Sequence, residues 1–195
     1  MGPSIPTYRW MMFVDGENLA IRAREVARAE GRRLDPAPHH MPDTFLWFPK
    51  HKATLRTGIG GTRLHLAPHS IRSFYYTAVQ GDEPKVIEVT ESLWSMGFSP
   101  VVFKKSAGAK SKGVDIRLTI DMLTNAFHGN YDLCILVAGD RDYVPIVKEV
   151  QRYGKVVSLA FFGHQAGGLA SELRLPSDEF HDFTSTFIAD CTSAP

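Results

Sequence analysis

The chain has 195 residues, enough for one domain with a full hydrophobic core. Hydrophobic residues make up 44% of it and charged residues 22%; these proportions are those of a globular protein and exclude a fibrous or disordered chain. The 22 Lys and Arg residues nearly balance the 21 Asp and Glu residues, so no whole-molecule charge draws the protein onto nucleic acid or an anionic membrane, and such binding would need local patches.

The two cysteines and the lack of long apolar stretches bear on the cellular compartment. Cys134 and Cys191 form neither a metal-ligand spacing nor a disulfide framework, which is usual in a reducing compartment. No apolar stretch approaches the ~20 residues that a membrane span needs. The opening residues MGPSIPTYRW lack the charged-then-apolar layout of a secretion signal. We therefore expect a cytoplasmic protein with no membrane partner.

Short apolar runs alternate with segments of helical spacing along the chain. The runs, rich in β-branched and aromatic residues, predict strands at residues 9–14, 71–78, 100–105, 133–138 and 155–162. The helical segments between them are residues 18–30, 84–96 and 143–153, which stop at Gly31, Gly97 and Gly154. In the third helix, Pro145 suits the first turn and Asp142 suits the cap. Continuous apolar strands that alternate with helices predict an α/β fold with a parallel sheet covered on both faces.

Residues 114–127 fit two patterns. Apolar residues alternate as in a strand from Val114 to Ile120, but Ile116, Ile120, Leu123 and Phe127 keep helical spacing. Fourteen residues are long for a strand and ordinary for a helix, so we predict a helix.

Residues 31–70 interrupt the alternation. They hold five prolines, a TGIGGT cluster, five of the eight histidines, and six Lys or Arg residues against two Asp. A connection this long is unusual inside a compact domain and is often functional. We predict a single domain over residues 1–195, with residues 31–70 as a basic insertion rich in His and Pro.

Aspartates follow or adjoin the strand ends. Asp15 follows the first predicted strand, Asp140 and Asp142 follow the fourth, and Asp115 begins the helix behind the third. In an open parallel sheet the carboxyl ends of strands meet at one edge, where ligands bind at the point of strand-order reversal. Any one of these aspartates alone is most simply a turn or cap residue. Together they would raise each other's pKa unless a cation sat among them. Carboxylate oxygens without Cys or His suit Mg²⁺ or Mn²⁺.

Three segments in this order resemble the NYN domain, specifically the LabA-like branch of the PIN-like nuclease superfamily. They are FVDGENL (13–19), KGVDIRLTIDML (112–123) and VAGDRDYVPIV (137–147), and residues 171–183 resemble the family's closing helix and strand. The resemblance implies a Rossmann-like fold with a central, mostly parallel sheet, for which we expect five strands with helices on both faces. It also implies metal-dependent hydrolysis of RNA phosphodiester bonds, with five residues on the family's motif positions: Asp15, Asn18, Asp115, Asp140 and Asp142.

On this interpretation each motif residue has an expected role. Asp15 and Asp140 hold Mg²⁺, while Asp115 and Asp142 bind a second ion or orient water. Attack by water on the phosphate expels the 3′ oxygen and leaves a 5′ phosphate. Asn18 positions a water or a ribose hydroxyl, or simply caps the first helix. Two further acids are second-tier candidates: Glu17, and Asp121, which lies about 120° around a helix from Asp115.

Basic residues near these acids are candidates for binding substrate phosphates. They are Lys105, Lys110, Lys112, Arg117 and Arg141. The insertion adds further Lys and Arg residues among Phe45, Trp47 and Phe48, and aromatic faces stack on unpaired bases. The expected partner is therefore RNA, in single-stranded form, although a solvated charged loop is the simpler explanation of any one such run.

Two other functions remain open on the sequence. The domain could be a catalytically silent NYN-type module that binds RNA or a partner, with the insertion forming a homodimer contact. It could also be another Mg²⁺-dependent enzyme of phosphoryl transfer on a similar sheet. The four aspartates favour the nuclease over the silent module.

Overall fold

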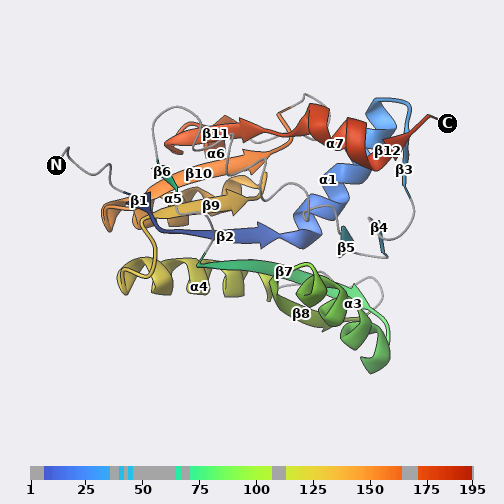
Figure 1. Cartoon of the computed structure of the whole chain (residues 1–195), viewed down its shortest axis with the longest axis horizontal. Coiled ribbons are helices and arrows are strands. Elements are labelled where there is room, and N and C mark those ends of the chain that lie inside the picture. The colour runs from blue at the N-terminus through green and yellow to red at the C-terminus, as the bar shows by residue number, and fades with distance from the viewer. Residues whose placement is uncertain are drawn as a thin grey trace.

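The computed structural model describes residues 7–35, 40–41, 44–45, 65–66, 71–106, 113–163 and 171–194. Six parallel strands form its central sheet in the order β11-β10-β9-β2-β7-β8 (Figure 1). They are β2 (Trp10–Asp15), β7 (Arg72–Gln80), β8 (Ser99–Lys105), β9 (Leu133–Val137), β10 (Val156–Phe161) and β11 (Glu179–Asp182). The five strands predicted from apolar runs are confirmed. The expected count of five was too low, because the segment that resembles the family's closing strand joins the same sheet as β11.

Helices cover both faces of this sheet, as predicted. One face carries α1 (Gly16–Ala29), α3 (Glu83–Ser95) and α7 (Thr184–Cys191), and the other carries α4 (Val114–Phe127), α5 (Val144–Arg152) and α6 (Ser171–Arg174). The side chains of β2 alternate between the two layers, since Met12 and Val14 belong to the first core cluster and Met11 and Phe13 to the second. Every strand residue of β2 is buried, so its continuous apolar run reflects burial on both faces.

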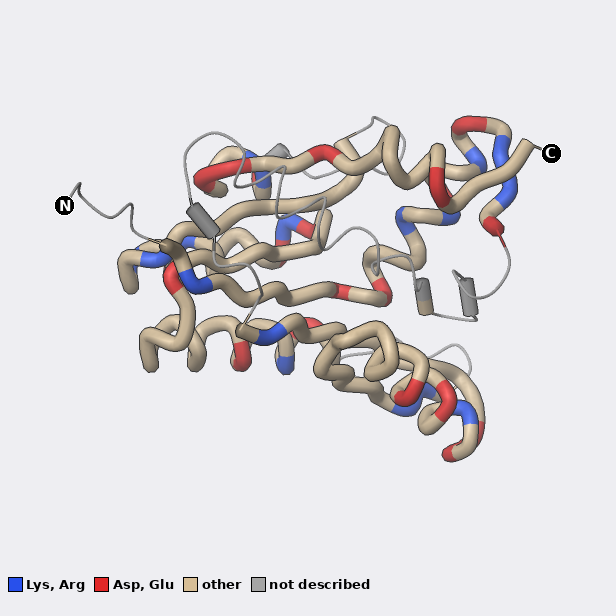
Figure 2. The backbone as a smooth tube through the Cα atoms, viewed as in Figure 1, with Lys and Arg blue, Asp and Glu red and all other residues tan. Residues whose placement is uncertain are grey.

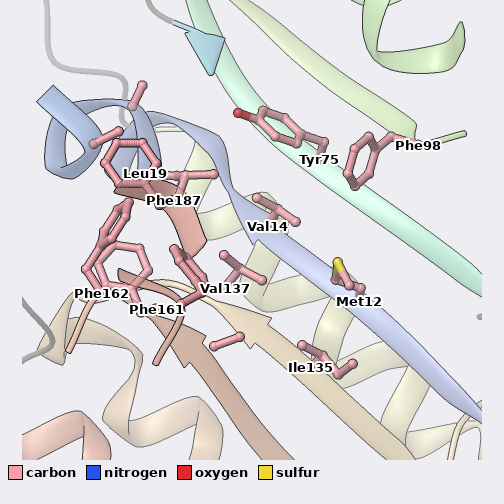
Figure 3. Packing of buried hydrophobic residues seen from close by; sticks show 14 of the residues in the cluster. Met12, Val14, Leu19, Tyr75, Phe98, Ile135, Val137, Phe161, Phe162 and Phe187 are labelled. Carbon is pink, nitrogen blue, oxygen red and sulfur yellow. The ribbon is translucent and has the colours of Figure 1, made fainter. Parts of the chain in front are cut away.

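Figure 3 shows the first of these layers. Met12 and Val14 of β2 lie beside Ile135 and Val137 of β9, and Leu19 of α1 packs over them. Aromatic rings close this layer at its edge: Phe162 lies 5.0 Å from Phe187 of α7 and 4.8 Å from Phe183, measured between ring centroids. The packing fixes α1 and α7 on the sheet, and α1 begins at the residue after Asp15.

The predicted helices are confirmed, including residues 114–127. The buried face of α4 consists of Val114, Leu118, Met122 and Ala126. One local prediction was wrong: Asp142 does not cap α5, whose N-cap is Tyr143 and has no side-chain cap bond. A single 3-10 turn, Arg141–Tyr143, precedes α5 and is capped by Asp140, because the Oδ1 atom of Asp140 accepts a bond of 3.1 Å from the Asp142 backbone N–H.

The order of the strands shows where in the sheet the ligand-binding crevice is expected. Numbered along the chain, the strands run 6-5-4-1-2-3 across the sheet, which is the order of doubly wound Rossmann-type sheets. The order reverses between the central neighbours β2 and β9, where Val14 lies in register with Val137. Asp15 and the loop that holds Asp140 therefore leave the sheet side by side at its carboxyl edge.

The described parts of residues 31–70 make small pairings outside the central sheet. β3 (Arg33–Leu34) pairs antiparallel with β12 (Thr192–Ser193), and β4 (His40–Met41) pairs antiparallel with β5 (Thr44–Phe45). β6 (His65–Leu66) pairs parallel with β1 (Thr7–Tyr8). This is the arrangement expected of an insertion, and the assignment of one domain stays a prediction.

The described helices and the charge distribution bear on membrane and nucleic-acid binding. None of the helices within the described ranges combines the length and apolarity that crossing a bilayer requires. Figure 2 shows Lys and Arg interspersed with Asp and Glu over the tube, with acidic residues at the end of β2 and the start of α1. Any binding to nucleic acid or to a membrane must therefore depend on local groups of charged residues and not on an excess of one charge over the whole surface.

Close packing requires a glycine at position 16, within the FVDGENL segment. A Cβ atom on Gly16 would lie 2.8 Å from the backbone oxygen of Tyr76 and closer still to the buried ring of Tyr75. We expect Gly16→Ala to lower the free energy of unfolding by roughly 1–3 kcal/mol or more, as overpacking does. Chemical denaturation measures this loss. Gly113→Ala is the control, because its Cβ would meet Phe103 at 3.4 Å, an ordinary contact. Equal losses for the two variants would contradict the steric explanation.

Candidate functional site

Asp15 is the most buried carboxylate of the site, with 3% of its surface exposed. It ends β2 and caps α1, because its Oδ1 atom accepts a hydrogen bond of 2.9 Å from the backbone N–H of Asn18. Its Oδ2 atom accepts a bond of 2.9 Å from the hydroxyl of Tyr143. Burial, together with the negative charges of Asp115 and Glu17, raises the pKa of Asp15 to about 7.

Tyr143 joins two of the predicted acids and was missed by the sequence analysis. Its hydroxyl oxygen lies 2.9 Å from Oδ2 of Asp15 and 3.3 Å from Oδ1 of Asp115. A phenol has one hydrogen, so it can donate to only one of two ionised carboxylates, and the second contact needs a proton on a carboxyl group. The raised pKa of Asp15 supplies a group that can hold this proton near neutral pH. The one sequence feature that pointed to this role was a tyrosine directly after the GDRD segment. We had assigned this tyrosine to the apolar pattern of the following helix.

Asp115 stands in the first turn of α4, and the charges of the other acids shift its pKa. Burial first, and then the negative charges of Asp140, Glu17 and Asp142, raise its pKa, while the bond from Tyr143 opposes this. Coulombic coupling of this kind requires proximity. Acids that lie up to 127 residues apart in sequence therefore gather at the carboxyl edge of the sheet. Asp140 and Asp142 themselves lie exposed on the 3-10 turn and its cap.

Asn18 holds the two central strand ends together. Its side-chain Oδ1 atom accepts a bond of 3.0 Å from the backbone N–H of Gly139, in the loop after β9. The cap of α1 is Asp15 and not Asn18, so the simple cap role is wrong. The NH₂ group of the Asn18 side chain can donate to a water or a ribose hydroxyl, and the second lone pair of Oδ1 can accept from one.

Lys105 and Glu17 form an ion pair beside the acids. Lys105 ends β8, and its Nζ atom lies 3.0 Å from Oε1 of Glu17 in the first turn of α1. The side chains are 10% and 25% exposed. The pair partly neutralises Glu17, and Lys105 would have to leave it to bind a substrate phosphate.

The remaining candidates bind groups outside the acidic site, lie exposed beside it, or fall outside the described residues. Asp121 accepts bonds from Arg117 Nε at 2.9 Å and from the hydroxyl of Tyr76 on β7 at 3.0 Å, so it faces a neighbouring strand. Arg141 is exposed and lines a hollow of about 390 Å³ beside Asp142 and Pro145. Lys110, Lys112 and the insertion's Trp47 and Phe48 lie outside the described residues, as does the side chain of Phe45.

The acids fit a hard divalent cation in chemistry and charge. Four carboxylates supply oxygen ligands of the kind that Mg²⁺ and Mn²⁺ take, and two of them have raised pKa values that a cation would relieve. Within the ranges that the structure describes, however, no three acidic, His or Cys side chains are close enough to hold an ion together. Side chains on the exposed 3-10 turn would have to rotate inward to complete a ligand set.

The raised pKa of Asp15 predicts a loss of stability as pH rises. An unfolded aspartate ionises near pH 4, whereas folded Asp15 does so at about 7, so its contribution to stability is complete below about pH 4 and disappears as pH rises through 7. The difference is on the order of 4 kcal/mol. Asp15→Asn keeps a capping oxygen and cannot ionise, so in chelator we expect it to melt above the unchanged protein at about pH 8.

Thermal denaturation across this pH range measures the effect. Asp132→Asn is the control, because Asp132 pairs with Arg9 at 2.9 Å, which lowers its pKa. Its contribution to stability is present above the ordinary pKa of an aspartate and is lost only in acid, so the melting temperature of this variant should run parallel to the unchanged protein near neutral pH. A parallel curve for Asp15→Asn would disprove the proton on Asp15.

Comparisons with known proteins agree with the fold. The family model of the NYN domain matches residues 9–186. A crystal structure of a protein of unknown function, VPA0982 from Vibrio parahaemolyticus, superposes with a TM-score of 0.58 over 93% of this chain and 96% of that chain, at 20% sequence identity, and so shares the fold. No curated protein matches the sequence. The family match spans the whole central sheet and every described acid of the site, and the chain therefore belongs to the NYN domain family.

Proposed function

We propose that this NYN domain is a metal-dependent ribonuclease of the LabA-like branch, which hydrolyses RNA phosphodiester bonds with Mg²⁺ or Mn²⁺. One observation carries the proposal. Asp15 and Asp115, which come from β2 and α4, lie on either side of the Tyr143 hydroxyl at the point where strand order reverses. NYN domains are nuclease-like as a family, which favours the same chemistry here.

The energetic cost of this arrangement supports a functional cause. Keeping Asp15 buried beside other acids costs on the order of 4 kcal/mol at pH 8, relative to an aspartate with an ordinary pKa. A domain of this size has a total stability of only ~5–15 kcal/mol. A cation held between the carboxylates offsets such a cost, and strongly perturbed acids of this kind cluster at functional sites.

The ligand set would consist of Asp15, Asp115, Asp140 and Asp142. A bound Mg²⁺ or Mn²⁺ supplies a water of lowered pKa and stabilises negative charge that develops on the phosphate. Tyr143 holds the carboxylates of Asp15 and Asp115 in place, and Asn18 fixes the loop that leads to Asp140. Water adds to phosphorus, the bond to the 3′ oxygen breaks, and the products carry a 3′ hydroxyl and a 5′ phosphate.

Basic side chains around the acids would position the RNA backbone. Arg141, exposed on the turn between Asp140 and Asp142, is the nearest to the acids along the chain. Lys105 and Arg117 each pair with an acid and would exchange it for a phosphate. Lys110 and Lys112 come shortly before α4 in the sequence. These contacts carry no sequence information, so we expect single-stranded RNA to bind with little base preference and strong salt dependence.

A catalytically silent binding module is the second candidate. It is favoured by the lack of a three-ligand group among the described residues and by the local bonds that both oxygens of Asp15 already accept. Each carboxylate oxygen has two acceptor sites, so a backbone N–H or a hydroxyl on one of them leaves the other for a cation. The silent module predicts RNA retention that needs neither metal nor acids.

The first test compares the same substitution, Asp to Asn, at a proposed metal ligand and at an acid outside the proposed ligand set. We expect single-stranded RNA to be cleaved in Mn²⁺ or Mg²⁺ and not in chelator. Asp140→Asn should lower the cleavage rate at least about a hundredfold, which corresponds to ~2.7 kcal/mol. Asp121→Asn is the matched control: its carboxylate bonds Arg117 and Tyr76, and the rate should change less than about threefold. Gel analysis of end-labelled RNA gives the rates and the product ends.

Two results would reject the nuclease. One is cleavage that survives Asp140→Asn in a preparation freed of contaminating nuclease by a second column. The other is metal-independent RNA retention, with no cleavage, that Asp140→Asn leaves unchanged; that result selects the silent module.

Tyr143→Phe tests whether the shared hydroxyl prepares the carboxylates for metal. The hydrogen bond from Tyr143 lowers the pKa of Asp15, so its removal makes Asp15 harder to ionise. We expect Mn²⁺ to bind roughly threefold to tenfold more weakly near pH 7 and the difference to shrink near pH 8.5, where the proton is lost anyway. Isothermal titration calorimetry measures both affinities. Tyr131→Phe is the control, because it also removes a buried hydroxyl, one that donates to the Met122 carbonyl and to no acid.

A further inference from the structure

Helix α4 has two apolar faces, and the sheet covers only one of them. Val114, Leu118, Met122 and Ala126 are buried against the strands. The other face consists of Ile116, Ile120, Leu123 and Phe127, which we call the outer stripe. Ile116 is 60% exposed, Ile120 is 53% exposed and Phe127 is 65% exposed, while Leu123 is half-buried between the two faces.

Exposed apolar side chains concentrate at this stripe. The ring of Tyr153, itself 42% exposed, lies 5.9 Å from the ring of Phe127 and extends the stripe beyond the end of α4. Figure 1 shows α4 along one outer edge of the molecule. Single exposed apolar residues are normal on a monomer, but a contiguous row of this kind marks an interaction site.

The spacing of the stripe matches a helix-pairing seam. From Ile116 to Phe127 the steps are four, three and four residues, the alternation with which two helices interlock side chains. The row is also symmetric along the helix: Ile116 and Phe127 lie equally far from the midpoint, and so do Ile120 and Leu123. An antiparallel copy of α4 therefore places Ile116 against Phe127 and Ile120 against Leu123, as a two-fold axis requires.

The charges beside the stripe allow two copies to meet. Arg117 and Asp121 flank it and pair with each other at 2.9 Å, so this flank carries no net charge to repel a second copy. Antiparallel packing also brings the amino end of one α4, with Asp115, to the carboxyl end of the other, with His128. Helix dipoles and an acid facing an imidazole are both favourable in this direction.

We propose that the outer stripe is the contact of a symmetric homodimer, in which α4 of one copy packs antiparallel against α4 of a second. A single helix pair buries less surface than a standard stable interface, so we expect a weak dimer whose population depends on protein concentration. Because Asp115 lies in the first turn of α4, each copy lies beside the acidic site of the other. The proposal rests on the exposed row of α4 and does not require nuclease activity.

Sedimentation velocity of the full chain over a hundredfold concentration range tests the dimer. We expect the unchanged protein to shift from monomer to dimer and Ile120→Arg to raise the dissociation constant at least tenfold. Ile87→Arg is the matched control: Ile87 is 50% exposed on α3, on the opposite face of the sheet, and this variant should dimerise as the unchanged protein does. Thermal denaturation checks that both variants fold.

A second measurement fixes the orientation of the helices. Cys134 and Cys191 are both buried, so Thr124→Cys offers one reactive surface thiol for a spin label. Thr124 lies next to Leu123 near the two-fold axis, and two labels should therefore report a short distance between copies. A protein that stays monomeric throughout, a dimer that Ile120→Arg leaves intact, or widely separated labels would each overturn the proposal. Monomers in which Ile120→Arg weakens RNA retention would assign the stripe to nucleic acid.

Discussion

The structure around the site depends on one buried carboxylate. Asp15 ends the central strand, caps the helix that follows and accepts the hydroxyl of Tyr143, so a single side chain fixes the direction of α1 and the distance between β2 and the turn after β9. Its burial beside other acids opposes its ionisation. The surrounding fold must therefore be rigid enough to hold it, and the close packing of Gly16 on Tyr75 and of Gly139 on Phe161 supplies that rigidity at the two strand ends.

This constraint links stability to chemistry. In the absence of a cation the raised pKa of Asp15 weakens the fold as pH rises; a cation among the carboxylates would replace the proton and remove the cost. The exposed acids of the turn, Asp140 and Asp142, can approach or leave without disturbing the core, because their side chains face solvent while the buried side chain of Tyr143 anchors the turn. The buried Asp15 is thus preorganised, whereas the exposed acids are adjustable, and the ligand set is complete only when both kinds are used.

In α4, the regular spacing of apolar residues predicted a helix but did not predict which face of that helix is buried. Its length and spacing indicated a helix correctly, but three of the four residues that gave this spacing, Ile116, Ile120 and Phe127, are exposed, and the sheet covers the row that starts at Val114. Two apolar rows on one helix are indistinguishable in sequence. Only the tertiary structure shows that the row starting at Val114 meets the strands. Similar limits applied to Tyr143 and to the Lys105–Glu17 pair, since a hydroxyl between two acids and an ion pair across 88 residues depend on distances that no local pattern contains.

The sequence by itself determined the α/β class, five of the six central strands, the helices α1, α3, α4 and α5, and the edge at which the acids gather. It could do so because apolar periodicity and strand-end position are local properties, and parallel strands necessarily bring their carboxyl ends to one side. Tertiary structure alone decided that β11 completes the sheet, that Asp140 and not Asp142 caps the turn, that Asn18 binds the neighbouring loop, and that Asp121 turns toward β7. Each of these depends on which groups meet across long stretches of chain, and such contacts are fixed by packing of the whole domain and not by any segment within it.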